Sequence, residues 1–75
     1  MEINVSKLKE TVVMKNTTME ALAYDMGMAR STLYRKLKRG TSGITLKDVI
    51  SISRSLRLSD DEAERIFGGS HVTRM

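Results

Sequence analysis

No cysteine and no proline occur in this sequence, and its aromatic residues are limited to two tyrosines and one phenylalanine. The lack of cysteine excludes disulfides, cysteine-ligated zinc and thiol chemistry. The shortage of aromatic side chains argues against a stacking platform for single-stranded nucleic acid. The one histidine, His71, lies near the C-terminus and has no cysteine with which to share a metal ion. We therefore expect no metal site and no cofactor.

Long apolar runs are also missing. No segment approaches the roughly 20 apolar residues of a membrane-spanning helix, and the N-terminus lacks the basic and then apolar pattern of a secretion signal. We therefore expect a cytoplasmic protein that does not associate with membranes. The 75 residues can form one small domain, without a nucleophile paired with a base or a glycine-rich phosphate loop. Neither enzymatic activity nor a small-molecule ligand is expected.

The basic residues are concentrated in one part of the chain. The net charge is +4 at pH 7, which favours an anionic partner. Residues 26–47 include no acid, whereas four of the nine acidic residues lie between Asp60 and Glu64. The acid-free segment contains six basic residues: Arg30, Arg35, Lys36, Lys38, Arg39 and Lys47. This segment is therefore the best candidate for contact with an anion.

Apolar periodicity predicts an all-α, compact five-helix domain over residues 1–68, followed by a flexible C-terminal tail over residues 69–75. The expected helices cover about 5–14, 17 or 18 to 26, 30–38, 45–56 and 59–67. Three helix starts fit a capping box, in which a hydroxyl and a carboxylate three residues later satisfy free amides. These pairs are Thr17 with Glu20, for which Thr18 is an alternative cap, Thr45 with Asp48, and Ser59 with Glu62.

The same periodicity predicts which side chains are buried. On the fourth helix we expect an apolar side formed by Leu46, Val49, Ile50 and Leu56, with Ile52 a less certain member. Methionine is a flexible filler of apolar gaps. Met14, Met26 and Met28 are therefore expected in or near the core, whereas Met19 is expected to be exposed and without a role.

The segment from Thr18 to Leu37 has the spacing of a helix-turn-helix, in which helices 2 and 3 meet at a sharp turn. Ala23 is small, as a close helix crossing requires. Gly27, four residues later, accepts the left-handed conformation of a tight turn. Leu33, six residues after the glycine, is placed to pack back against helix 2.

With these features, residues 18–67 resemble the helix-turn-helix domain of the lambda Cro and lambda repressor superfamily. The resemblance also rests on Leu22, Leu37, and the later helices entered as Ile44-Thr45-Leu46 and Leu58-Ser59-Asp60-Asp61-Glu62. The string from Arg30 to Leu37 is similar to the reading helix of Fis-type activators. Two positions depart from the common pattern, since Met19 replaces a frequent glutamine and Ala29 replaces a capping Ser or Thr.

The resemblance implies that the third helix enters the major groove of double-stranded DNA. Base-reading residues would then be Arg30, Ser31, Thr32 and Arg35. Phosphate-binding candidates are Thr18, Tyr34, Lys36, Lys38, Arg39, Thr41 and Ser42. Such proteins usually bind a palindromic operator as homodimers. Ile66, Phe67 and Val72 are candidates for the dimer surface, with core closure an equally good interpretation of the first two.

We therefore expect a sequence-specific DNA-binding transcriptional regulator, of the phage or prophage repressor kind and complete in this chain. Two other classes of function remain open. One is a protein-interaction module such as an antirepressor or an antitoxin that binds a toxin, and the other is the DNA-binding module of a recombinase or excisionase. The salt dependence of binding separates DNA contact from protein contact, because phosphate contacts release counterions.

Overall fold

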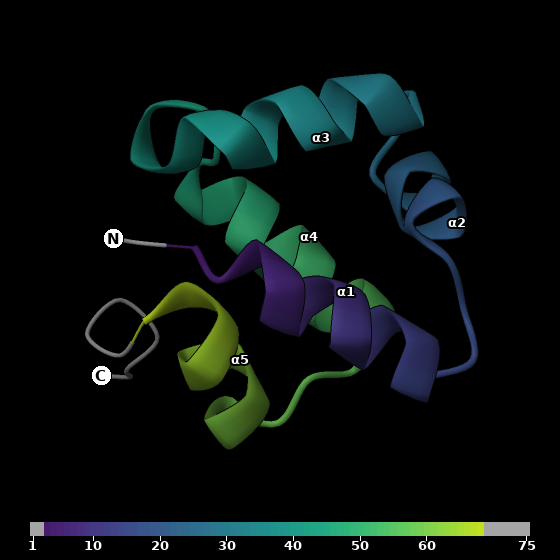
Figure 1. The fold of residues 1–75 in the computed structure, drawn as a ribbon, viewed down its shortest axis with the longest axis vertical. Coiled ribbons are helices and arrows are strands. Elements are labelled where there is room, and N and C mark those ends of the chain that lie inside the picture. Colours follow the sequence, from purple (N-terminus) through teal and green to yellow (C-terminus); the bar gives the residue numbers. More distant parts are fainter. Residues whose placement is uncertain (1–2, 69–75) are drawn as a thin grey trace.

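The computed structural model describes residues 3–68, apart from the side chain of Thr41, and this part of the chain is all-helical (Figure 1). Its elements are α1 (Val5–Met14), α2 (Met19–Asp25), α3 (Arg30–Arg39), the 3₁₀ turn η1 (Gly40–Ser42), α4 (Leu46–Leu56) and α5 (Asp60–Phe67). The predicted all-α, five-helix domain is confirmed. The expected tail, residues 69–75, lies outside the described residues. None of the described helices has the length and apolar character needed to cross a membrane.

Two of the predicted capping boxes are present. At the start of α4, the Thr45 hydroxyl accepts from the Asp48 amide and the Asp48 carboxylate accepts from the Thr45 amide, each at 3.1 Å. Ser59 and Glu62 make the same pair of bonds before α5, at 3.1 and 2.9 Å. These bonds satisfy amides that a helix start otherwise leaves without a partner.

The third predicted capping box, Thr17 with Glu20, is wrong, and the alternative cap Thr18 is confirmed. Thr18, not Thr17, is the cap of α2, and its hydroxyl accepts from the Ala21 amide at 3.0 Å. Position 18 therefore pairs with the third helical residue, as a cap requires. Ala29, before α3, makes no side-chain cap hydrogen bond, as its lack of a polar group dictates.

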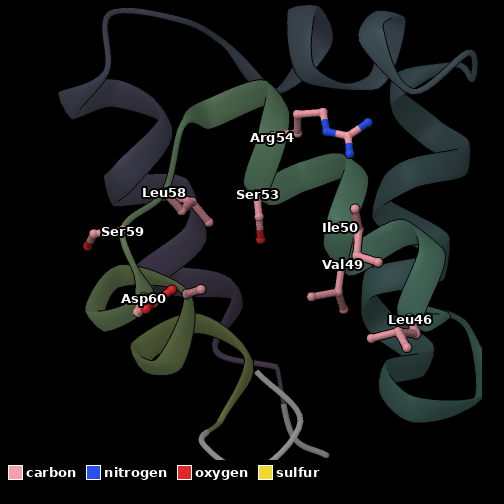
Figure 2. A pocket seen from close by; sticks show the side chains of 9 residues that line it. Leu46, Val49, Ile50, Ser53, Arg54, Leu58, Ser59 and Asp60 are labelled. Carbon is pink, nitrogen blue, oxygen red and sulfur yellow. The ribbon is translucent and has the colours of Figure 1, made fainter. Parts of the chain in front are cut away.

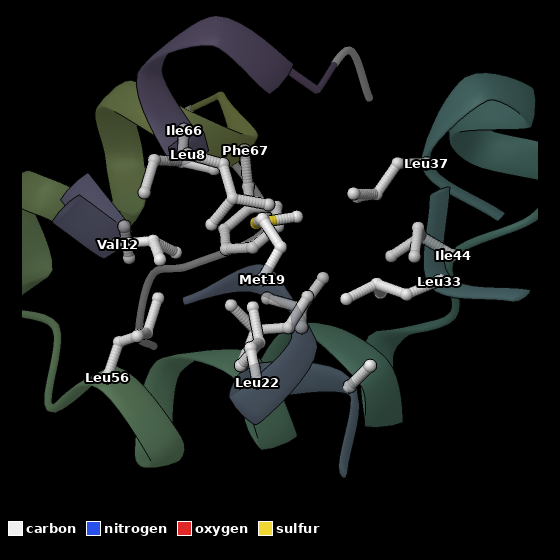
Figure 3. Close-up of a cluster of buried hydrophobic side chains, with 14 residues drawn as sticks. Leu8, Val12, Met19, Leu22, Leu33, Leu37, Ile44, Leu56, Ile66 and Phe67 are labelled. Carbon is white, nitrogen blue, oxygen red and sulfur yellow. The ribbon is translucent and has the colours of Figure 1, made fainter. Parts of the chain in front are cut away.

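One apolar core joins all five helices (Figure 3). Ile66 and Phe67, at the end of α5, are 0% exposed. The expectation that they form a dimer surface is therefore wrong for this fold, because their side chains close the core. The third candidate for that surface, Val72, lies outside the described residues. The remaining buried apolar residues are Leu8, Val12, Met19, Leu22, Ala23, Leu33, Leu37, Ile44, Val49, Ile52, Leu56 and Ala63.

Several burial predictions are wrong. Met19 is buried, whereas Met14, expected in the core, is 70% exposed at the end of α1. Met19 follows the Thr18 cap, so its side chain turns toward the core from the first turn of α2. Met26 and Met28 are half-buried and pack against the core, as expected.

The buried side of α4 also differs from the prediction. Val49, Ile52 and Leu56 form the buried stripe, whereas Leu46 is 61% and Ile50 48% exposed. The separations of three and four residues between Val49, Ile52 and Leu56 place them on one face of the helix. Ile50 lies one position off that stripe, and Leu46 lies at the first helical position. Two large apolar side chains therefore remain on the surface of α4.

The helices α2 and α3 pack against each other through a short turn. Gly27 has a φ of +75°, in the region that favours glycine, and it reverses the chain between the two helices. The Met28 amide donates to the Ala23 carbonyl at 3.0 Å, which fixes the turn against the end of α2. Ala23 is 1% exposed and Leu33 is fully buried, as the helix-turn-helix spacing predicts.

The far end of α3 is tied to the start of α4. Gly43 lies so close to α3 that a Cβ atom there would collide with the Lys36 carbonyl oxygen and approach the Arg39 Cβ to 2.8 Å. This close approach brings Asp48 beneath α3, where its carboxylate is 2.8 Å from the Lys36 ammonium. Partial burial alone would raise the pKa of Asp48, but hydrogen bonds from Lys36 and from the Thr45 amide outweigh it and lower that pKa.

Replacing Ala23 with leucine is expected to destabilise the domain by about 1–3 kcal/mol, because the larger side chain cannot fit between α2 and α3. Ala21, on the same helix but exposed, provides the matched control. Thermal and urea unfolding should show a lower free energy of unfolding for Ala23→Leu and little change for Ala21→Leu. Equal stability of the two variants would contradict the packing described for α2 and α3.

The ion pair of Asp48 should make stability depend on pH. Its carboxyl has a lower pKa in the folded chain than the ordinary 3.8, so it contributes stability above that value and loses the contribution as pH falls through the folded pKa. Asp48→Asn is therefore expected to be less stable at pH 7, by about 1 kcal/mol. The difference should shrink as the pH is lowered below 3.8.

Thermal unfolding midpoints measured from pH 7 to pH 2.5 would test this expectation. Glu64→Gln is a suitable control, since Glu64 is exposed and forms no ion pair among the described residues. A difference between the native chain and Asp48→Asn that stays constant over the whole pH range would refute the role given to the Lys36–Asp48 pair.

Candidate nucleic-acid interface

The candidate interface is the outer face of α3, which lies along one side of the molecule in Figure 1. Leu33 and Leu37 anchor the inner face in the core. With about 3.6 residues per turn, Ser31, Arg35 and Lys38 fall on the opposite face of the helix. All three are exposed. The fold therefore brings the Ser31 hydroxyl, the Arg35 guanidinium and the Lys38 ammonium group to a single surface.

The two flanks of α3 differ in what they contact. Arg30 and Tyr34 lie on the flank toward α1 and the start of α2, where they line a shallow groove with Thr18. Thr32 and Lys36, four residues apart, lie on the other flank, toward α4. Thr32 is half-buried there. Of the four predicted base readers, Ser31 and Arg35 therefore point straight outward, Arg30 lies at one edge and Thr32 lies at the other.

The exposed surface of α3, its outer face and its flanks together, carries positive charge that the fold does not neutralise. Among the described residues, Arg30, Arg35, Lys38 and Arg39 form no ion pair. All four are exposed. Basic side chains without acidic partners are available to an anion, and their charges add where they share one face.

Lys36 differs from its basic neighbours. Its ammonium is paired with Asp48 and its side chain is only 29% exposed. Its predicted phosphate contact would compete with this pair, so we assign its charge to the joint between α3 and α4. The sequence could not separate Lys36 from Lys38, because the two differ only in which side of the helix they occupy.

The cap of α2 lies beside the start of α3. Thr18 accepts a hydrogen bond from an amide, which leaves its hydroxyl proton free for donation to another group. The groove that it shares with Arg30 and Tyr34 also contains Lys9 from α1 and Glu20 from α2. This edge of the surface therefore has mixed charge, in contrast to the outer face of α3.

Lys9 is a residue that sequence reasoning missed. Its ammonium lies 5.3 Å from the centre of the Tyr34 ring, within the range of a cation–π contact. Tyr34 itself is half-buried and packs against the core. The contact places a basic side chain of α1 next to α3, although 25 residues separate the two in the sequence. No local pattern distinguishes Lys9 from a solvated lysine.

The loop after α3 contains the last predicted phosphate contacts. The Ser42 hydroxyl donates to the Arg39 carbonyl at 3.2 Å, so its proton is engaged within the turn. The side chain of Thr41 is outside the described part of the structure. Within residues 3–68, no group of three or more histidine, cysteine or acidic side chains could hold a metal ion.

Comparison of this chain with models of known protein families, with characterised proteins and with solved structures found no match. The function must therefore be argued from the geometry and charge of the chain itself.

Proposed function

We propose that this protein binds double-stranded DNA in a sequence-specific manner, as a transcriptional regulator of the phage repressor kind, with α3 in the major groove. The observation that carries the proposal is the outer face of α3, on which Ser31, Arg35 and Lys38 are exposed and the two basic residues have no ion pair in the described part of the chain. An α-helix about 10–12 Å across fits a major groove about 12 Å wide.

Each residue of this face has a chemical role in the proposal. Arg35, opposite the core, reads guanine, because its planar fork matches the O6 and N7 acceptors. Ser31 can donate to or accept from a neighbouring base edge. Lys38 and Arg39 bind phosphates and set the position of the helix without reading sequence. Arg30, at the edge of the face, contacts a base or the phosphate beside Thr18.

Base reading also requires a helix that is held in one orientation. Two contacts hold α3 at opposite ends, the turn through Gly27 at its start and the Lys36–Asp48 pair near its end. Between them, Leu33 and Leu37 are anchored in the core. The backbone of such a helix needs no further ordering on binding, which favours specific contacts over loose attraction to phosphate.

One helix contacts only a few base pairs, so we propose that the protein acts as a homodimer on a palindromic operator. Half-sites would then lie about 34 Å apart, one turn of DNA. A surface used only for protein contact is a poorer explanation of α3, since charged residues are depleted at the centres of protein interfaces.

The proposal is tested by titrating duplex DNA at several salt concentrations. Binding through phosphates releases counterions, so the logarithm of the association constant should fall linearly with the logarithm of salt concentration, with a slope of about −0.9 per phosphate contact. Binding that does not change with salt, or no binding to any duplex at low salt, would rule out the proposed use of the surface.

Arg35→Ala should weaken binding to the preferred site by about 1–3 kcal/mol and relax discrimination at one base pair. Arg65→Ala is the matched control, because Arg65 is an exposed arginine on α5, on the opposite side of the molecule from α3 (Figure 1). Competition binding with a set of single-base variants of the site would measure the effect. An unchanged base preference in Arg35→Ala would remove Arg35 as a reader.

Lys38→Ala should weaken binding to all sequences alike and lower the salt slope by about one. Lys36 lies on another side of α3 and is paired with Asp48. Lys36→Ala should therefore lower the free energy of unfolding and change the salt slope less than Lys38→Ala does. Salt titrations of both variants at a temperature where each is folded would separate the two roles. A loss in Lys38→Ala that is restricted to certain sequences would show that Lys38 reads bases.

A further inference from the structure

An apolar groove lies between α4 and α5, and none of the residues that line it belongs to α3 (Figure 2). Its volume is about 470 Å³. The floor is formed by Val49, Leu58 and Ala63, and Ser53 lies between them on α4. The groove has no part in the proposed DNA contact.

One wall of the groove is an apolar ridge whose side chains lie outside the core. This ridge consists of Leu46 and Ile50, which are 61% and 48% exposed and lie one turn apart on α4. Burying two such side chains stabilises an association, whereas leaving them in water costs free energy. The surface thus presents an apolar ridge next to an apolar groove.

Opposite charges flank the groove. Arg54 extends from α4 on one side and Asp60 lies at the start of α5 on the other (Figure 2). Both are exposed, and no ion pair joins either of them to another described residue. A partner with an anion near Arg54 and a cation near Asp60 would complement both charges.

A second copy of this chain meets all of these requirements. Rotation by two-fold symmetry about an axis through the groove exchanges its two sides, because in such an interface each surface contacts the same surface of its partner. Arg54 of one copy then faces Asp60 of the partner copy, and the reverse pair forms at the same time. The same rotation sets the Leu46–Ile50 ridge of each copy opposite the α5 side of the partner copy's groove.

We infer that the α4–α5 groove is the homodimer interface of this protein, with two Arg54–Asp60 pairs across the two-fold axis. The inference rests on the proposed function only in assigning the dimer a role in DNA binding. The complementary charges and apolar surfaces belong to the groove, whether or not the protein binds DNA. None of the groove residues belongs to α3, so the proposed dimer contact does not use the residues assigned to DNA. The surface replaces the one expected from Ile66 and Phe67, which are buried.

The test is a charge exchange measured by sedimentation without DNA. The native chain should show a monomer–dimer equilibrium between roughly 1 µM and 1 mM. Arg54→Glu and Asp60→Arg should each raise the dimer dissociation constant about tenfold or more, because each places like charges together twice. An equimolar mixture of the two variants should recover the dimer, because both of its charge pairs are then opposite in sign.

Two further variants separate the interface from stability. Ile50→Glu should also abolish the dimer, while Val13→Glu, at a 71% exposed apolar position on α1, should not. Circular dichroism would verify that each variant is folded. A native chain that stays monomeric over the whole concentration range overturns the inference, and so does a dimer that persists in Arg54→Glu, Asp60→Arg and Ile50→Glu. Since no DNA is present, neither result decides whether α3 binds DNA.

Discussion

The structure depends on the packing of α2 against α3, in which Ala23 and Leu33 are buried. Gly27 forms the turn between the two helices in a conformation that favours glycine. Leu33 and Leu37 of α3 face the core. The opposite face of α3 therefore points to solvent. The orientation of Arg35 follows from the packing of residues that never touch a ligand.

Charge is distributed over the fold in a consistent way. Two acidic side chains both cap a helix and pair with a lysine of another helix or helix end, Asp48 with Lys36 and Glu62 with Lys15. The Ser59 amide and the Lys15 ammonium both lower the pKa of Glu62. The basic residues of the outer α3 face are left out of these pairs. This separation keeps attraction to an anion and stability of the fold in different groups of residues, so either can be altered by mutation without the other.

The features that the sequence predicted are those fixed by near neighbours. Capping boxes at Thr45 and Ser59 act within three residues, and the Gly27 turn acts within four, so a local pattern contains the necessary information. The features that it missed depend on which side of a helix meets another helix. Tertiary packing decides three such features: the ion pair of Lys36, the contact of Lys9 with Tyr34, and the exposure of Ile50. Periodicity predicts the buried face of a helix but not which neighbouring helix each side chain meets.

Selection of bound duplexes from random DNA at near-physiological salt tests whether the outer face of α3 reads a DNA sequence. We expect an enriched motif containing guanine, repeated as a palindrome with half-sites about 10 base pairs apart. Recovery of duplexes with no shared motif, bound only through their phosphates, would contradict this expectation.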